Sequence, residues 1–381
     1  MSKRTRRRFL KDCGLSLGAL STAMAGPDRH PRRTPGPGDF RSEFDVVVYG
    51  GTSAGVTAAV QASRMGCATV LVSPERHLGG LTSSGLGWTD TGDQSTIGGL
   101  SREFYRRVHD HYENPSAWQY EKPEELNADR GAGQFEPDED AMWVFEPHVA
   151  ERIFEEMLQE NGVLVVRDAW LDRENGVYTR EGRIYAIRTE AGTTFRGRAF
   201  IDATYEGDLL AAADVSFTVG RESNEKYGET WNGVQKGVHH HRHYFKKDIS
   251  PYVVPGQSGT GLVPHIHGGD PGRNGEGDRR VQAYCFRMCM TKVPGNRVPW
   301  PRPESYDERW YELLLRNFEA GDHRLPLKID MMPNRKTDTN NRGAFSTDNI
   351  GRNYAYPTAS YGERRRIVKA HEIYQKGLLW T

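Results

Sequence analysis

The sequence predicts an α/β fold, and three observations predict it. A strand, a glycine turn, a helix and a second strand follow one another within residues 45–80. A third apolar, buried-strand pattern begins near residue 199, and short alternating runs separated by turns fill residues 169–198. Parallel strands joined by a helix, with an antiparallel meander beside them, indicate a Rossmann-like domain, and a second, mixed α+β domain is expected after it.

The N-terminal residues are typical of an export signal. Thr5–Lys11 (TRRRFLK) fits the twin-arginine pattern, and the weakly apolar stretch that follows ends at the small-residue site Ala23-Met24-Ala25. The stretch is too short to span a membrane. A disordered basic tail is the alternative. We therefore expect residues 1–25 to direct the chain through the twin-arginine export machinery to the bacterial periplasm, with residues 26–43, rich in Pro, Gly and Arg, as a linker.

Residues 45–80 are expected to form one complete unit. Val46–Tyr49 is an apolar, β-branched run of the kind found in parallel strands that are buried on both faces. Ala54–Met65 has a small-residue face and predicts a helix that ends at Gly66. Ala68–Val72 supplies the second strand. The amides at the start of this helix favour a pyrophosphate above the turn.

The glycine turn matches the G-x-G-x-x-G pattern imperfectly. Gly50 and Gly55 take the first and third glycine positions, whereas Thr52 stands where the second glycine allows close approach of phosphates. The acidic residue expected at the end of the second strand is replaced by Ser73, with Glu75 two residues later. An α/β domain without a cofactor can contain the same unit, so the turn alone leaves nucleotide binding open.

Two later motifs extend this unit. A glycine-bearing loop, RHLGGLTS (residues 76–83), follows the second strand, and the third strand, AFIDAT (residues 199–204), continues into YEGDL. With GGTSAG, HLGG and IDATYEGD, the chain resembles the FAD-dependent oxidoreductase family of the glutathione-reductase-like flavoprotein superfamily, from about Phe44 to the C-terminus. The resemblance implies an FAD-binding domain over residues 44–214, with an insertion at about 84–145.

The resemblance also implies which residues contact FAD. The diphosphate would lie on Gly50, Gly51, Thr52, Ser53, Ala54 and Gly55, and the adenosine ribose would face Ser73, Glu75 and Arg76. The loop beside the cofactor would contribute Gly79, Gly80, Leu81 and Thr82, and the other side would be formed by Ala203, Thr204 and Asp208.

The rest of the first domain has clear local signals. Glu146–Asn161 is an amphipathic pattern with Pro147 in its first turn, which predicts a helix packed on the sheet ahead of a strand at Val163–Val166. Residues 169–198 are punctuated by Asn175-Gly176, Glu181-Gly182 and Ala191-Gly192, which indicates antiparallel hairpins.

Residues 215–381 lack a βαβ rhythm and predict a substrate domain. His239, His240, His241 and His243 form a basic stretch in which a polar loop is favoured over a metal site; His240 is a candidate acid or base, and His265 and His267 are ambiguous. Residues 332–356 crowd polar side chains, including the catalytic candidates Lys336 and Asp338, into either a functional loop or a surface loop. A final helix, Glu363–Thr381, stops within its apolar pattern, so an incomplete domain is expected.

Composition narrows the class of protein. A chain of 381 residues has room for about two domains, and 51 basic against 51 acidic side chains give no net field for nucleic acid or an anionic membrane. The arginine clusters are therefore interpreted as solvated surface. Cys67, Cys285 and Cys289 match no redox pair or iron–sulfur set and are predicted to be buried on strands, and no metal is expected.

The resulting hypothesis is an FAD-dependent oxidoreductase. A carbon that bears O–H or N–H, in a small polar substrate, would give a hydride to FAD, while a protein base takes the proton and an unassigned acceptor reoxidises the flavin. Two alternatives are an NAD-dependent dehydrogenase built on the same unit, and an exported noncatalytic or carbohydrate-binding protein that keeps the fold.

Overall fold

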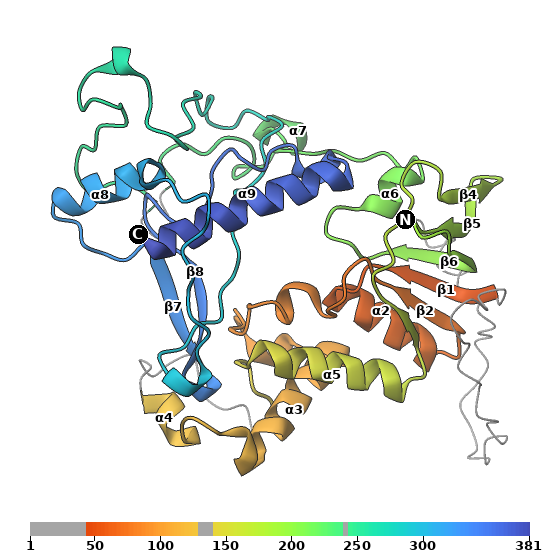
Figure 1. Ribbon diagram of the computed structural model, residues 1–381. Coiled ribbons are helices and arrows are strands. Elements are labelled where there is room, and N and C mark those ends of the chain that lie inside the picture. The colour runs from red at the N-terminus through yellow and green to blue at the C-terminus, as the bar shows by residue number, and fades with distance from the viewer. Residues whose placement is uncertain (1–42, 129–139, 239–242) are drawn as a thin grey trace.

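The computed structural model describes residues 43–128, 140–238 and 243–381, and the larger of its two sheets has six strands, seen at the right of Figure 1. The strand order is β3-β2-β1-β6-β5-β4. The four parallel strands are β1 (Glu43–Tyr49), β2 (Thr69–Val72), β3 (Leu164–Val166) and β6 (Thr194–Asp202), and the two antiparallel strands are β4 (Val177–Arg180) and β5 (Arg183–Arg188). The predicted α/β fold is confirmed.

Strand β1 has both edges paired, with β2 and β6, and both faces buried, each in a different core cluster. Val46 pairs with Thr69 on one side and with Ala199 on the other. Val46 and Val48 pack with the helices α2 (Ser53–Arg64), α3 (Gly99–Glu113) and α5 (Pro147–Glu160), whereas Val47 and Tyr49 point to the second core cluster. This alternation follows from the pleat of a strand, which sends successive side chains to opposite faces.

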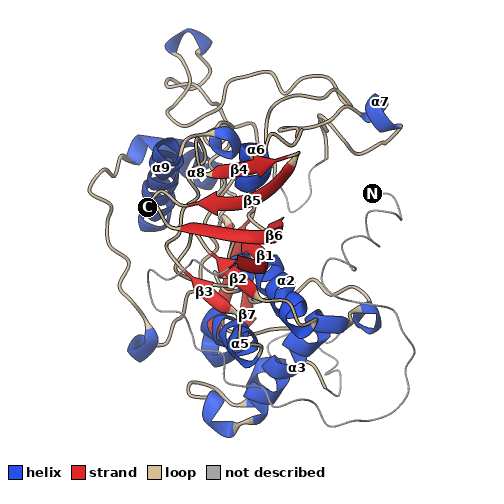
Figure 2. Ribbon diagram, turned by 90° about the vertical axis from the view of Figure 1, so that its right-hand side faces the viewer, coloured by secondary structure: helices blue, strands red, loops and turns tan. Residues whose placement is uncertain are grey.

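The predicted meander is part of the main sheet rather than a separate unit. The sequence indicated a meander that ends at residue 198 and a new strand from residue 199, but one continuous strand, β6, covers both. Its first half pairs antiparallel with β5, through Ala186 and Arg196, while its length from Arg196 onward pairs parallel with β1. Figure 2 shows β4 and β5 extending the sheet beyond β6. The carboxyl end of β6 therefore lies beside the carboxyl end of β1.

The second part of the chain has long connections and few regular elements. Helix α6 (Asp208–Ala212) follows β6 directly and packs beside it, so it belongs to the first part. The helices of the second part are α7 (Asn224–Tyr227), α8 (Glu312–Glu319) and α9 (Tyr361–Trp380), and its hairpin joins β7 (Leu327–Met332) to β8 (Lys336–Asn341). Helix α4 covers Pro123–Ala128, and short 3-10 helices cover Gly80–Thr82, Gln94–Thr96, Pro115–Ala117, Ser258–Thr260, Pro294–Asn296, Glu308–Tyr311, Pro333–Arg335 and Tyr356–Thr358. None of the helices in the described ranges is long and apolar enough to cross a membrane.

Strand β8 corrects the expectation of a loop after Met332. Asp338 pairs with Asp330 of β7, and Thr337, Asp338 and Thr339 are all buried. Two β-branched threonines favour the strand, and their hydroxyls satisfy each other at 2.8 Å. A polar strand can be buried here because its side chains have partners, which the composition of the segment does not reveal.

The cysteine prediction is right only for the burial of Cys67, and none of the three cysteines lies on a strand. Cys67 is buried just before β2, but Cys285 is half-buried and Cys289 is exposed, and neither lies on a strand. The segment that holds them runs extended beside the hairpin and contacts it through the isolated bridge between Met288 and Thr339.

Candidate nucleotide site

The turn between β1 and α2 needs glycine at two positions. Gly50 has φ +113°, and a Cβ there would lie 2.6 Å from backbone atoms of Ala203 and Thr204. A Cβ on Gly55 would lie 1.9 Å from the carbonyl oxygen of Gly50. The first glycine therefore permits the turn and its approach to β6, and the other permits close packing of α2 on the turn.

Thr52 has a structural role at the second glycine position. Its hydroxyl accepts a hydrogen bond from the Gly55 amide (3.2 Å) and donates one to the carbonyl oxygen of Ala203 (2.7 Å). Thr52 thus caps α2 and ties the turn to the end of β6. The amides of Ser53 and Ala54 are in the first turn of α2, where a helix offers no acceptor of its own, so they are free to bind an anion.

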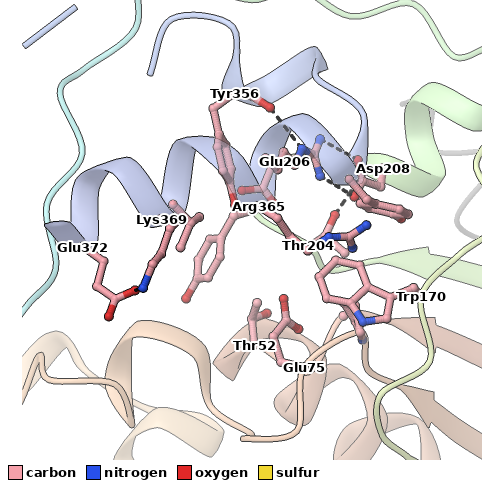
Figure 3. A pocket seen from close by; sticks show the side chains of 16 residues that line it. Thr52, Glu75, Trp170, Thr204, Glu206, Asp208, Tyr356, Arg365, Lys369 and Glu372 are labelled. Carbon is pink, nitrogen blue, oxygen red and sulfur yellow. Dashed lines mark hydrogen bonds and ion pairs between the residues drawn. The ribbon is translucent and has the colours of Figure 1, made fainter. Parts of the chain in front are cut away.

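A cavity of about 370 Å³ lies beside this turn, between the carboxyl ends of the strands and α9 (Figure 3). Its volume is within the range of roughly 300–1,000 Å³ that is usual for ligand sites. The lining residues are Gly50, Thr52, Pro74, Glu75, Trp170, Thr204, Tyr205, Glu206, Asp208, Tyr356, Tyr361, Arg364, Arg365, Val368, Lys369 and Glu372. Five of the residues predicted from the sequence are among them: Gly50, Thr52, Glu75, Thr204 and Asp208.

Glu75, and not Ser73, presents a polar group to the cavity. Ser73 is buried, and its hydroxyl donates to the carbonyl oxygen of Glu75 at 2.9 Å and accepts from the Glu75 amide at 3.2 Å. This local turn directs the Glu75 side chain to the cavity wall. Loss of hydration there raises the pKa of the Glu75 carboxyl, and the nearby Glu206 and Asp208 carboxyls raise it further. The acidic residue missing from the end of β2 is thus supplied two residues later.

The loop after β2 begins at the protein surface, and its glycine residues then contact the turn between β1 and α2. Arg76 is exposed, 3.5 Å from Asp168, and does not line the cavity. The Gly79 amide donates to the carbonyl oxygen of Gly51 at 2.8 Å, which holds this loop against the turn. The Leu81 amide donates to the hydroxyl of Tyr205 at 2.8 Å. The residues from Gly79 to Thr82 therefore lie beside the turn between β1 and α2 (residues 50–55, called the nucleotide turn below), outside the cavity itself.

Asp208 is held by Arg364, a residue from the far end of the chain. The Arg364 guanidinium donates to both Asp208 carboxylate oxygens at 2.8 Å, and both side chains are buried. Arg364 also donates to the backbone oxygens of Tyr356 (3.0 Å) and Pro357 (2.7 Å). The interpretation of the arginine clusters as solvated surface is therefore wrong for Arg364. An arginine in an amphipathic helix carries no sequence signal for a partner 156 residues away.

The α9 residues of the site were not found by sequence reasoning. Arg365, Val368, Lys369 and Glu372 recur at helical spacing along α9, which places them on one face of that helix. Tyr205 and Glu206 were within a recognised motif but were not assigned to the cofactor. Trp170 comes from a loop and Tyr356 from a short 3-10 helix, and the position of both depends on the tertiary fold.

The catalytic candidate Lys336 is engaged in a buried polar cluster. Its Nζ atom lies 2.7 Å from Oε1 of Glu146, whose side chain is 3% exposed, whereas the Lys336 side chain is 21% exposed. The other Glu146 oxygen accepts hydrogen bonds from the Tyr112 hydroxyl (3.0 Å) and the Asn334 amide (2.8 Å). Lys336 is the member of this cluster that solvent can reach.

Asp338, the second candidate, joins three segments. Its Oδ1 accepts from Arg287 Nη1 at 2.7 Å, and its Oδ2 accepts from the Trp88 amide at 3.3 Å. Burial raises the pKa of the Asp338 carboxyl, although Arg287 opposes this rise. The third candidate, His240, lies outside the described residues, as do His239 and His241.

The remaining histidine candidates, His265 and His267, each pack against an aromatic ring. The His265 ring lies 4.0 Å from the Trp310 ring, and burial lowers the pKa of this imidazole. His267 contacts the Tyr354 ring edge-on. Within residues 43–128, 140–238 and 243–381, no group of three or more His, Cys, Asp or Glu side chains is placed to hold a metal ion.

The protein has an α/β fold with a cavity at the carboxyl ends of parallel strands, the place where such folds bind ligands. The chain belongs to the FAD-dependent oxidoreductase family, whose model matches residues 45–381. This membership identifies FAD as the cofactor and favours an oxidoreductase over the NAD-dependent and noncatalytic alternatives.

Solved structures with partial similarity include L-proline dehydrogenase from P. horikoshii, with 16% identity, a TM-score of 0.32, and coverage of 48% of this chain and 58% of that one. L-amino acid deaminase from Proteus vulgaris has 16% identity and a TM-score of 0.32, with coverage of 53% and 54%. A 3-ketosteroid-delta4-(5alpha)-dehydrogenase from Rhodococcus jostii RHA1 has 18% identity and a TM-score of 0.26, with coverage of 44% and 46%. The chain thus spans little more than half of the first two structures. No curated protein matches it significantly.

The residues present fit an FAD molecule. Ser53 and Ala54 offer amide donors for a diphosphate, and Glu75 offers a carboxylate for ribose hydroxyls. Trp170 and Tyr356 add aromatic surface to the same cavity. When bound, FAD supplies a ring system that accepts a hydride.

Proposed function

We propose that this chain oxidises a small polar substrate at a carbon that bears O–H or N–H, with FAD as the hydride acceptor. The observation that carries the proposal is the loop of residues 79–88. It runs from the turn between β1 and α2 to the polar residues around Lys336 and Asp338 of β8. Its first end is fixed by the Gly79 amide on Gly51, and its far end by the Trp88 amide on Asp338. A cofactor that follows this loop would reach the cluster.

For the cofactor, we propose the residues implied by the family resemblance, with a refinement for the ribose. The diphosphate would bind at Gly50–Gly55, and the ribose hydroxyls would bind the Glu75 carboxylate, because Ser73 is engaged in its local turn. The flavin half would pass Gly79–Thr82. Ala203, Thr204 and Asp208 would shape the opposite side, with Asp208 acting through Arg364.

For the substrate, we propose that Lys336 binds the polar group and that Asp338 positions Arg287. The partly exposed Lys336 ammonium can donate to a substrate oxygen or nitrogen while Glu146 holds it in place. Asp338 is almost inaccessible, at 2% exposure, so it acts through the guanidinium and backbone that it holds. His240 remains a candidate for the accompanying proton.

An absorbance spectrum of the purified chain tests the cofactor, and anaerobic bleaching tests the reaction. We expect a yellow protein after reconstitution with FAD, and bleaching by at least one sugar, amine or hydroxy acid of a panel. A chain that stays colourless after reconstitution would contradict FAD binding. A yellow chain that no hydroxyl or amine compound bleaches would contradict the proposed substrate class alone.

A matched pair of lysine variants tests the substrate site. Lys336→Arg keeps the positive charge beside Glu146 but moves the donor atoms, so we expect reduction by substrate to slow by about tenfold or more, the loss of one charge-assisted hydrogen bond. Lys292→Arg is the control, because Lys292 is exposed on the neighbouring extended segment. Equal rates of reduction in the two variants would contradict the proposal that Lys336 binds the substrate.

We also propose that the protein is exported by the twin-arginine route to the periplasm. The support is the sequence pattern at Thr5–Lys11, which lies outside the described residues. Replacing Arg6 and Arg7 by lysine should retain the protein in the cytoplasm of a bacterial host. Unchanged appearance in the periplasmic fraction would contradict the route.

A further inference from the structure

The charges that line the cavity are paired except at three residues. Asp208 is paired with Arg364, and the Lys369 ammonium lies 3.0 Å from the Glu372 carboxylate. Glu75 and Glu206 remain, and their carboxyl pKa values are raised by loss of hydration. Among the described residues, the only lining cation without an ion-pair or hydrogen-bond partner is Arg365, whose side chain is exposed to the cavity.

Arg364 is committed to the protein itself. Its donors reach two carboxylate oxygens and the backbone oxygens of Tyr356 and Pro357. This fixed guanidinium anchors the first turn of α9 on α6, which Figure 1 shows at adjacent ends. The next residue, Arg365, is held by the same turn at the wall of the cavity (Figure 3).

The opposite wall of the cavity is the nucleotide turn. Gly50 and Thr52 line it, and the first-turn amides of α2 follow directly. A ligand that carries negative charge between these amides and Arg365 would be bound from two sides. The two uncompensated carboxyls, Glu75 and Glu206, make a cation at this wall more important, because they repel an anion.

We infer that Arg365 of α9 binds the diphosphate of FAD, so that the site begun by the turn after β1 is completed from the C-terminal helix. The inference rests on the binding of FAD to this cavity. A guanidinium is suited to the role because its planar donors match two phosphate oxygens at once. The Arg364–Asp208 pair then positions Arg365 rather than binding the cofactor.

Titration of the purified full chain with FAD, ADP and riboflavin tests the inference. Arg365→Ala should weaken the binding of FAD and of ADP by about ten- to a hundredfold, which is typical of losing a charge-assisted hydrogen bond, and should leave riboflavin binding unchanged. Arg366→Ala is the matched control, because Arg366 pairs with Glu363 and its side chain is 76% exposed, outside the cavity lining. Circular dichroism checks that both variants are folded.

The outcomes separate the inference from the proposed function. If wild-type protein binds none of the three ligands, both fail. If wild type binds FAD and Arg365→Ala binds FAD and ADP as tightly as Arg366→Ala, the inference alone is overturned. Should Arg365→Ala not fold, arginine-selective labelling with phenylglyoxal replaces it: FAD and ADP should protect Arg365 of the wild type, and equal labelling with and without them overturns the inference.

Discussion

At the scale of single residues, the cavity depends on carboxyl groups with different roles. Asp208 is neutralised by two hydrogen bonds from Arg364 and supports the structure. Glu75 and Glu206 face the cavity without such a partner, and each has a raised carboxyl pKa. Groups whose pKa values are shifted by burial in a cleft are candidates for function. We therefore interpret Glu75 and Glu206 as ligand-facing and Asp208 as architectural.

Removal of Arg364 should destabilise the fold strongly. Arg364→Ala removes both hydrogen bonds from the buried Asp208 carboxylate and leaves only the longer contact with Arg173, at 3.5 Å. Loss of one partner of a buried ion pair costs about 3–5 kcal/mol. Urea unfolding followed by tryptophan fluorescence measures the loss. Arg366→Ala should change the free energy of unfolding by less than about 1 kcal/mol, because its ion pair is exposed. Similar losses in the two variants would contradict the structural role of the Asp208–Arg364 pair.

Glu206 should make stability depend on pH. Its pKa is raised in the folded protein, chiefly by loss of hydration, so the folded state holds the proton more tightly than the unfolded chain. Below the ordinary glutamate pKa of about 4.3, Glu206 is protonated in both states and its burial as a carboxylate costs no free energy of folding. Stability is lost as the pH rises from there through the raised folded pKa, because a poorly hydrated carboxyl must then ionise.

Glu206→Gln removes this penalty. The variant should be more stable than the wild type at pH 8 and should lose that advantage at pH 4. Urea midpoints at a series of pH values measure the difference. A difference that does not change with pH would show that ionisation of Glu206 is not its cause.

At the scale of elements, α9 connects the two parts of the molecule. Its first turn contacts α6 through Arg364, and its last turns pack Tyr374 and Leu378 against Tyr311 in the third core cluster. The helix thus spans from the nucleotide cavity to the core beside α8 (Figure 1). The amphipathic pattern of α9 predicts a helix. It does not predict the contacts with α6 and Tyr311, because both are with residues far away in the sequence.

Two glycines in α9 give a sharp test of this packing. A Cβ on Gly377 would lie 2.0 Å from the Tyr311 hydroxyl, whereas a Cβ on Gly362 has its nearest neighbour at 3.9 Å. Gly377→Ala should therefore destabilise the protein, although alanine favours a helix by up to about 1 kcal/mol. Gly362→Ala should be neutral or stabilising. Thermal unfolding of both variants measures this, and a stabilised Gly377→Ala protein would show that α9 does not pack against Tyr311.

At the scale of the whole molecule, the cavity has walls from the beginning and the end of the described chain. The turn after β1 forms one wall and α9 forms the other. A ligand that bridges them binds the folded state and stabilises both parts together.

Bound FAD should therefore raise the stability of the whole chain. At a free FAD concentration of about 100 times its Kd, the expected gain is about 2.7 kcal/mol. Thermal scans with increasing FAD measure the shift, and far-UV circular dichroism and tryptophan fluorescence should report the same midpoint. A rise seen by one probe only would contradict a site shared by both parts.

The local signals in the sequence were sufficient for the nucleotide unit. The turn, α2, β1 and β2 are specified by nearest-neighbour features such as glycines, β-branched runs and a helix cap, which act within a few residues. The loop expected at residues 332–356 failed as a prediction over residues 336–341, which form β8. The partners that make this polar strand tolerable come from elsewhere, among them Arg287 and Trp88.

By itself, the sequence determined the α/β class, the strand and helix bounds of the nucleotide unit to within a few residues, and the resemblance to a flavoprotein family. Only the tertiary structure decided that β6 unites the meander with the parallel sheet, that Glu75 rather than Ser73 faces the cavity, and that α9 closes it through Arg364 and Arg365. The physical reason is the distance along the chain over which each interaction acts. Propensities and caps act between neighbours along the chain, whereas burial and ion pairing depend on segments that only folding brings together.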